Sequence, residues 1–425
     1  MAKLNFEAEN SLHATHGLHA FAAKCPPQLV KYGISRYSSP GETVLDTMMG
    51  SGTTLVEARL MGRNGIGYDL DPLARLIASV KARPLSDETI GAVFDQVLRR
   101  AKSDLDAIRG RHASAAAAAR GTPPDFPRRD FWFDENVCIA LALISYHIDQ
   151  ADGSNAVRNF LWVAFSSLIL SKTSVANARD IVHSRPHRYQ HPKRPDVIER
   201  FAFRVKRMRA QMCEFRTGCS KAGAAHISAR CGDARRLGMW EETADLFFTS
   251  PPYVTALDYP RAHWLAVAWM EKPLGITPEG YGELATRYIG SERGPMKGDF
   301  EIDEALGGFR TAKSVLTDLA QTSPRQAKLA QRYFLDMVRA LKTGTRVLKT
   351  GRHAILVVCP SHIRKVYVPT HRVLVEIGRA VGLRLKRRHE RTISERRRVL
   401  PYLPEDFGSR MSTEYVLVFQ KSKET

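Results

Sequence analysis

The sequence predicts an α/β fold that is built on a mostly parallel sheet and interrupted by a mostly helical segment. Residues 43–48 read as a buried strand, 50–54 as a glycine-rich turn, 55–61 as a helix and 64–69 as a second strand. A strand, a helix and a strand within about thirty residues are typical of a parallel pair. Strand patterns return only near residue 225, so the block between them is expected to be helical.

Further elements are expected on both sides of this block. The predicted helices lie at 26–39, 86–120, 134–178 and 326–341. Strands are expected at 225–230, 244–249 and 353–358, and a closing antiparallel pair at 383–393 and 415–420. Residues 279–325 are polar and glycine-rich and are expected to form a mobile loop region. The predicted division is one domain from 13–85 and 223–421, with a helical insertion at 86–222.

The charge of the chain favours a polyanionic partner. Lys and Arg number 64 against 44 Asp and Glu, which gives a formal charge of +20. Residues 179–209 hold ten basic against three acidic residues, and residues 384–398 hold eight against two. A solvated charged face is the alternative. The candidate nucleic-acid-binding residues are Arg185, Arg188, Lys193, Arg194, Arg396, Arg397 and Arg398.

Several classes of protein are not expected. The six cysteines form no CxxC pair, which disfavours a zinc ribbon and a disulfide scaffold. Cys213, Cys219, His226 and Cys231 fit no usual zinc spacing, so no metal is expected. No signal peptide and no apolar run of membrane-spanning length is found, so a cytoplasmic protein without a membrane partner is expected. The oligomeric state is left open.

The first chemical motif runs from Asp46 to Thr54. Its glycines stand between a strand and a helix, where they allow the backbone to approach a ligand closely. A carboxylate after the next strand typically accepts hydrogen bonds from ribose hydroxyls. No Gly-Lys-Ser/Thr follows, so a phosphate-binding P-loop is disfavoured, and a plain turn is the alternative. The candidate cofactor residues are Asp46, Met48, Gly50, Ser51, Gly52, Thr53, Asp69 and Asp71.

The second motif is Ser250-Pro251-Pro252-Tyr253, which follows a predicted strand. Two prolines end the strand and hold a rigid turn, so the carbonyl groups of Ser250 and Pro251 are expected to be free acceptors. The aromatic ring can stack on a flat base. Acceptors placed around an exocyclic amine would favour a tetrahedral nitrogen whose lone pair points at a methyl donor. These four residues are the candidate catalytic residues, and an ordinary Pro-Pro turn is the alternative.

Together the two motifs resemble those of the amino-methylating DNA methyltransferases, specifically the N4-cytosine branch with its Ser-Pro-Pro-Tyr. Residues 19–30 (HAFAAKCPPQLV) are similar to the segment that forms one wall of the family's cofactor pocket, and Gly232-Asp233 resembles its acidic end of the third strand. Residues 258–261, 346–349 and 414–419 match further family elements. The resemblance implies a Rossmann-like class I methyltransferase fold with a C-terminal antiparallel strand. It also implies S-adenosylmethionine as cofactor, with Lys24, Pro26 and Asp233 as added cofactor residues.

The resemblance implies methylation of cytosine N4 in DNA, as in restriction–modification, with the base flipped out of the duplex. The insertion takes the place of the family's target-recognition region; a helical lid is the alternative. Adenine-N6 enzymes usually have Asp or Asn in place of Ser250 and remain an alternative, as does methylation of RNA. Cytosine-C5 chemistry is disfavoured because Cys25 precedes its prolines. Met48 replaces the family's usual aromatic residue, which leaves a nucleic-acid-binding protein with an inactive methylase fold as the non-enzymatic alternative.

Overall fold

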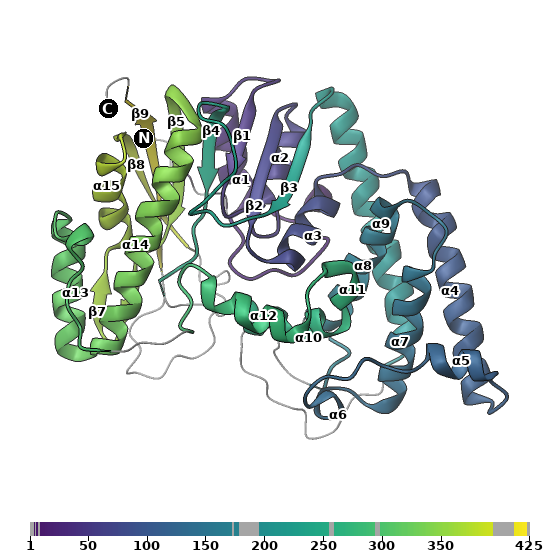
Figure 1. Ribbon diagram of the computed structural model, residues 1–425. Helices are drawn as coiled ribbons and strands as arrows, with labels where there is room; N and C mark the ends of the chain where they lie inside the picture. Colours follow the sequence, from purple (N-terminus) through teal and green to yellow (C-terminus); the bar gives the residue numbers. More distant parts are fainter. Residues whose placement is uncertain are drawn as a thin grey trace.

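A seven-stranded sheet forms the centre of the structure (Figure 1). The computed structural model describes residues 4, 6, 9–171, 174–177, 195–254, 259–293, 298–393 and 412–422. The strand order is β3-β2-β1-β4-β5-β9-β8, and β9 is antiparallel to both of its neighbours while the other pairs are parallel. The strands are β1 (Thr43–Asp46), β2 (Asn64–Asp69), β3 (Ile227–Cys231), β4 (Ala244–Thr249), β5 (Leu348–Val358), β8 (Leu383–Thr392) and β9 (Thr413–Lys421), with a separate hairpin of β6 (Ser361–Ile363) and β7 (Val366–Val368).

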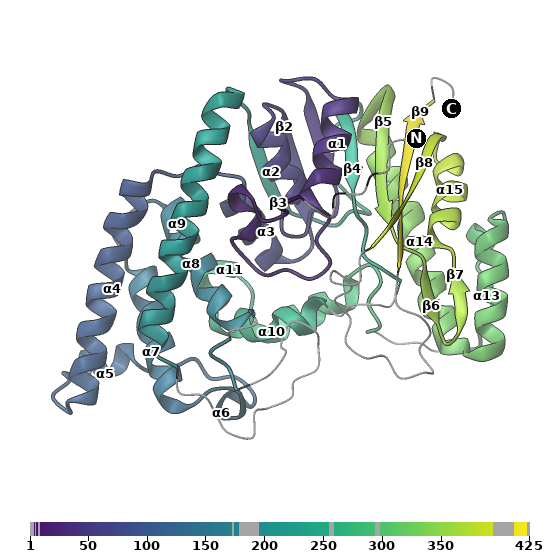
Figure 2. The same cartoon turned by 180° about the vertical axis from the view of Figure 1, so that it is seen from behind.

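Apolar side chains of the central strands point alternately to the two faces of the sheet, and both faces are buried. Leu246 and Phe248 of β4 pack on one face with α1 (Pro27–Tyr37), whereas Phe247 packs on the other with α14 (Pro324–Val347). Figure 1 shows α14 in front of β5, and Figure 2, from behind, shows α1 in front of β4. Strands that are buried on both faces are expected for a parallel sheet with helices on each side.

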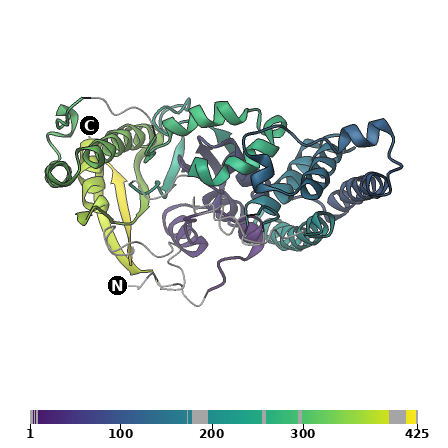
Figure 3. The same cartoon turned by 90° about the horizontal axis from the view of Figure 1, so that it is seen from below.

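The helical insertion leaves and re-enters the sheet at its β3 edge. Its helices are α4 (Asp87–Arg109), α5 (Ala115–Arg120), α6 (Arg129–Trp132), α7 (Glu135–Asp149), α8 (Asn155–Ile169) and α9 (Val197–Ala222). Figure 3 shows these blue helices at one end of the molecule and the green α13–α14 region at the other. The insertion packs on the sheet domain because α9 contacts α2 (Thr53–Leu60) and η1 (Ala14–Gly17), and α8 contacts α3 (Pro72–Lys81).

The expected α/β fold is confirmed, including the βαβ unit and the closing antiparallel pair, which is β8 and β9. The prediction of a loop region at 279–325 was wrong in part, because α13 (Arg310–Thr322) lies within it. One face of α13 packs against α14 through buried residues at helical spacing: 312, 315, 316 and 319. This helix was not predicted because glycines precede it in the sequence. The remaining helical elements are α10 (Tyr259–Trp269), α11 (Glu271–Leu274), α12 (Pro278–Leu284), η2 (Ala285–Arg287), η3 (Glu304–Leu306) and α15 (Thr370–Ala380).

Candidate active site

The candidate site lies at the carboxyl ends of the parallel strands, where ligands bind in open α/β sheets. One cavity of about 1170 Å³, counted with its open mouth, is lined by the loops that follow β1, β2, β3 and β4. Gly52 and Pro26 are not among its lining residues; they stand at the starts of α2 and α1. The other predicted residues of the site all line it: Lys24, Asp46, Met48, Gly50, Ser51, Thr53, Asp69, Asp71, Asp233, Ser250, Pro251, Pro252 and Tyr253.

The turn between β1 and α2 depends on two glycines in left-handed conformations. Gly50 has φ 50° and Gly52 has φ 80°, a region that other residues rarely adopt. A Cβ atom on Gly52 would lie 2.7 Å from the Cβ atom of Ala78 in α3. Glycine at this position therefore lets the turn pass close to α3, while Gly50 and Ser51 face the cavity.

Asp46 joins the ends of the two central strands. Its carboxylate accepts hydrogen bonds from the hydroxyls of Thr54 at 2.6 Å and Thr249 at 2.8 Å, and from the N–H of Met48 at 3.1 Å. Burial raises the pKa of Asp46 to about 6, although these hydrogen bonds oppose the shift. Because Thr249 directly precedes the Ser-Pro-Pro-Tyr turn, Asp46 fixes the glycine-rich turn and the candidate catalytic turn relative to each other.

Asp69 lies at the end of β2 and braces the glycine-rich turn. One carboxylate oxygen accepts the N–H of Gly50 at 2.8 Å, and the other accepts the N–H of Asp71 at 2.9 Å. Burial, together with repulsion from the Asp71 carboxylate, raises the pKa of Asp69 to about 7. No side-chain donor to Asp69 is found within the described part of the chain, so its carboxylate has capacity for ligand hydroxyls.

Asp71 is engaged by the protein itself. It caps α3 by accepting the N–H of Leu73 at 2.8 Å, and its other oxygen lies 2.6 Å from His263 Nδ1 and accepts the Tyr281 hydroxyl at 3.0 Å. Burial opposes its ionisation, but His263 and these hydrogen bonds hold the pKa of Asp71 below its usual value. This carboxylate therefore fastens α3, α10 and α12 to the cavity wall.

Asp233 follows β3 and forms a two-pronged ion pair with Arg235. The guanidinium group donates to the two Asp233 oxygens at 2.9 and 2.8 Å, and its third nitrogen lies 2.9 Å from Asp336 in α14. Burial opposes the ionisation of Asp233, but the hydrogen bonds from Arg235 hold its pKa below the usual value. The same guanidinium donates to the carbonyl of Arg287, which ties the segment after α12 to the cavity.

The Ser-Pro-Pro-Tyr turn is held from two sides. The Ser250 hydroxyl donates to the carbonyl of Val357 in β5 at 3.2 Å, and the Tyr333 hydroxyl donates to the carbonyl of Pro252 at 3.0 Å. Within the described residues, no main-chain N–H donates to the carbonyl oxygens of Ser250 or Pro251. Burial raises the pKa of Tyr253 well above its usual range, so this phenol is neutral at physiological pH. The turn therefore presents acceptors and a neutral aromatic ring.

Sequence reasoning missed part of the cavity wall. Phe21 and Tyr259 are stacked with ring centroids 6.0 Å apart, and Phe21 also lies 5.1 Å from the His263 ring. Both aromatic residues stand in segments that resemble the family, but their role as lining was not inferred. Residues 287–289 and 291 also line the cavity, and nothing in their local sequence indicates this.

The predicted nucleic-acid-binding residues, 185, 188, 193, 194 and 396–398, lie outside the described residues. Parts of both basic clusters are described. Arg209 forms a two-pronged ion pair with Asp87 at 2.7 Å, so it stabilises the packing of α9 on α4. By contrast, β8 exposes a row of basic side chains at residues 384 and 386–388.

Comparison with known proteins agrees with the resemblance. A family model described as "DNA methylase", for N6 and N4 methyltransferases, matches residues 3–78. The type II methyltransferase M.MvaI of Kocuria varians is 25% identical over 88% of this chain and 83% of its own length. M.MjaII of Methanocaldococcus jannaschii is 38% identical over 23% of this chain and 18% of its own length.

The family model and these type II methyltransferase relatives support the amino-methylating DNA methyltransferase family, which the two motifs resemble. S-adenosylmethionine is the cofactor of this methyltransferase. Among solved structures, a SAM-dependent methyltransferase of Methanosarcina mazei matches 92% of this chain and 97% of its own, with 10% identity and a TM-score of 0.33. A putative DNA modification methylase of Thermus thermophilus matches 46% of this chain and 53% of its own, with 15% identity and a TM-score of 0.23. Within the described residues, no helix combines the length and apolarity that a membrane crossing requires.

Proposed function

We propose that this methyltransferase transfers a methyl group from S-adenosylmethionine to the exocyclic N4 of cytosine in DNA. The observation that carries the proposal is the single cavity that joins the glycine-rich turn, the acidic strand ends and the Ser-Pro-Pro-Tyr turn. M.MvaI, M.MjaII and M.MthZI are type II methyltransferases, which supports DNA as the substrate. Adenine N6 is the second candidate, because the family model covers both kinds of amine.

The residues of the cavity fit the cofactor. Asp69 has a carboxylate that no described side chain satisfies, and it stands where ribose hydroxyls are bound in such folds. Asp233 would lie near the adenine, and Lys24, which lines the cavity, near the cofactor carboxylate. When bound, S-adenosylmethionine supplies an electrophilic methyl group on a sulfonium. Met48 is half-buried at the cavity wall and offers a soft apolar contact where the family usually has an aromatic residue.

The turn would act on the amine through acceptors. The amine of cytosine is a poor nucleophile, because its lone pair is delocalised into the ring. The carbonyls of Ser250 and Pro251 would accept its N–H bonds out of the ring plane and so localise the lone pair toward the methyl group. Tyr253 would stack on the base. Because the Asp46–Thr249 hydrogen bond fixes the turn beside the cofactor loop, the geometry is set before the base enters.

Ser250 favours cytosine over adenine within this proposal. Its only hydroxyl hydrogen is directed to the Val357 carbonyl, so its oxygen lone pairs are left to share the two amine N–H groups with the main-chain carbonyls of the turn. In this way a neutral hydroxyl takes the accepting role that Asp or Asn usually has in the adenine-N6 branch. A duplex substrate has to present the base outside the stack, because an amine within the stack does not reach the cavity.

We also propose that residues 86–222 form the target-recognition region. The helices of this insertion stand at one end of the molecule, away from the β8 edge (Figure 1). Exchange of this region with that of a related enzyme should change the methylated sequence and keep the type of methylated base. A changed base type would refute the assignment.

The decisive experiment identifies the methylated nucleoside. The purified chain is incubated with labelled S-adenosylmethionine and, in separate reactions, with DNA and RNA pools. N4-methylcytosine in DNA is expected. N6-methyladenine would show that the enzyme acts on adenine, and a labelled RNA nucleoside would show that it acts on RNA; either result would refute the proposal. Absence of cofactor binding in calorimetry would favour the inactive-methylase alternative.

Variants of the turn test the mechanism. Ser250→Ala and Tyr253→Ala should lower methyl transfer by about 100-fold or more, as removal of a transition-state hydrogen-bonding group does, and leave cofactor affinity intact. Ser35→Ala, at an exposed position of α1, is the matched control. Full activity in both variants of the turn would overturn the catalytic assignment.

A further inference from the structure

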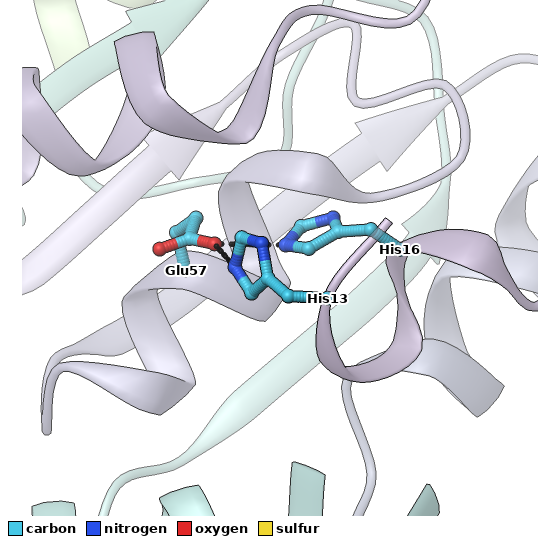
Figure 4. Close-up of side chains that lie close together, drawn as sticks. All are labelled: His13, His16 and Glu57. Carbon is cyan, nitrogen blue, oxygen red and sulfur yellow. Dashed lines mark hydrogen bonds and ion pairs between the residues drawn. The ribbon is translucent and has the colours of Figure 1, made fainter. Parts of the chain in front are cut away.

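Two histidines and a glutamate form a cluster beside α2, the helix that follows the glycine-rich turn (Figure 4). His13 precedes η1, His16 lies within it, and Glu57 lies in α2. The ligand-capable atoms of the three side chains are all within 4.8 Å of one another. Nε2 of His13 is 3.0 Å and Nε2 of His16 is 2.8 Å from the same oxygen of Glu57. We propose that this cluster is a binding site for one divalent transition-metal ion, with Zn²⁺ as the expected ion.

The donor set matches zinc chemistry. Two imidazole nitrogens and one carboxylate oxygen are the protein ligands of many zinc sites, with a water molecule in the fourth position. Bond lengths of about 2.0–2.2 Å place tetrahedral ligand atoms about 3.4 Å apart. Glu57 would therefore move outward by about half an ångström, and the ligand atoms, which now lie within 4.8 Å of one another, would close around the ion. The Glu57 and His16 side chains are 2% exposed, whereas His13 is 31% exposed and provides access for the ion and its water.

The surroundings of His13 support metal ligation. Its Nδ1 lies 2.9 Å from the carbonyl of Asn10, and metal-ligating histidines usually donate their second N–H to such a group. Ala14 lies between the two histidines with φ 48° although it is 3% exposed. This left-handed conformation is costly for alanine. Figure 4 shows both imidazoles directed toward Glu57.

Proton positions define what the metal replaces. Both Nε2 atoms face the same oxygen of Glu57, and Nδ1 of His13 faces the carbonyl of Asn10, so the ion would take the place of hydrogen between the Nε2 atoms and Glu57. The hydrogen bond to Glu57 raises the pKa of His13, and burial lowers the pKa of His16 to about 4. Zinc binding would require an Nε2 lone pair on each imidazole, so neither Nε2 would then carry hydrogen.

The charges around the cluster are compatible with a cation. Although burial opposes its ionisation, hydrogen bonds from His13 and His16 hold the pKa of Glu57 at about 2, so it is an anion at neutral pH. The negative charge of Glu214 in α9 also raises the pKa of His13, so it favours positive charge at the cluster. Lys81 is the opposing cation nearby, and burial lowers its pKa well below the usual range, which lessens its repulsion.

The site would fasten the wall of the cofactor cavity. The carbonyl of His16 accepts a hydrogen bond at 3.1 Å from Lys24, and the segment continues to Phe21 and Cys25, which line the cavity. The sequence did not indicate this cluster, because Glu57 lies 41 positions beyond His16 and no local spacing joins them.

Zinc titration of the full chain tests the proposal. Untagged protein is stripped with a chelator, dialysed and titrated with Zn²⁺ against a chromophoric competitor. About one equivalent should bind with an apparent Kd below about 1 μM, and Co²⁺ should give visible absorption typical of a four-coordinate site. His13→Ala should weaken zinc affinity by more than about 100-fold, since even loss of an outer-shell partner costs 10–100-fold. His112→Ala, at an exposed histidine, should bind as the parent does.

Circular dichroism of each variant confirms the fold, and His13→Ala is the principal variant because His13 is partly exposed. Binding of well under one equivalent by folded parent protein would overturn the proposal. So would equal affinity of the parent and His13→Ala, which would leave the cluster as a hydrogen-bonded clamp. Both measurements record zinc binding and not methyl transfer, so failure of the proposal and failure of the proposed function are distinguishable.

Discussion

The substitution Gly52→Ala tests the close approach of the glycine-rich turn to α3. At φ 80° an alanine is strained by about 1–2 kcal/mol, partly offset by about 0.4–1 kcal/mol from a stiffer unfolded chain. The new Cβ would also lie 2.7 Å from Cβ and 2.9 Å from Cα of Ala78, and neither atom can rotate away. Such overpacking typically costs about 1–3 kcal/mol. We therefore expect the free energy of unfolding to fall by about 2–4 kcal/mol.

Gly41→Ala provides the matched control. Gly41 has nearly the same backbone conformation, φ 83°, but a Cβ there would meet nothing within 4 Å. Its cost should be about 1 kcal/mol or less, which is backbone strain alone. Urea unfolding measures both variants. Calorimetry with S-adenosylmethionine should show affinity about tenfold weaker for Gly52→Ala and unchanged for Gly41→Ala, since 1.4 kcal/mol corresponds to tenfold. Equal destabilisation with unchanged cofactor affinity would refute the reasoning.

Three further predictions concern the cavity wall. Burial and the Asp71 carboxylate raise the pKa of Asp69 to about 7. Because the ionised carboxylate is the better acceptor for ribose hydroxyls, cofactor affinity should rise as the pH increases from about 6 to about 8. Calorimetry across this range should show a flat profile for Asp69→Asn, and a persisting slope would contradict the assignment. Tyr333→Phe removes the hydrogen bond to Pro252 and should lower kcat about 3–10-fold without weakening cofactor binding, whereas Tyr367→Phe at an exposed position should have no effect. Asp71→Ala removes a helix cap and leaves His263 and Tyr281 without their acceptor, so the free energy of unfolding should fall by about 2–4 kcal/mol. Asp125→Ala, at an exposed position, is the control, and an equally small decrease for both variants would count against this role of Asp71.

Local signals were sufficient to predict the centre of the fold. The strand at 43–46, the glycines after it and the strand at 64–69 each follow from burial and turn chemistry within a few residues. The Ser-Pro-Pro break likewise marks the end of β4. These signals are local because a parallel strand and its turn are encoded by consecutive residues.

Long-range partners could not be predicted in this way. Asp71 was predicted as a cofactor residue and lines the cavity, but no local pattern indicated its protein partners His263 and Tyr281, the latter 210 positions away. Arg235 similarly joins Asp233 to a helix about a hundred positions later, and no local pattern marks it. Such contacts depend on how the helices pack on the sheet, and the local sequence around each residue does not determine that packing.

The place of the insertion explains how two distant motifs can form one site. Asp46 and Thr249 are 203 positions apart, yet they are hydrogen-bonded because β1 and β4 are neighbours at the centre of the sheet. The chain between them leaves after α3 and returns through β3 at the edge, so the length of the insertion does not disturb the central pair. The insertion is nevertheless part of the fold, because α9 packs on α2, which begins at the glycine-rich turn. The insertion therefore contacts the helix that begins at the glycine-rich turn, on the side of the sheet domain that carries the candidate cofactor residues.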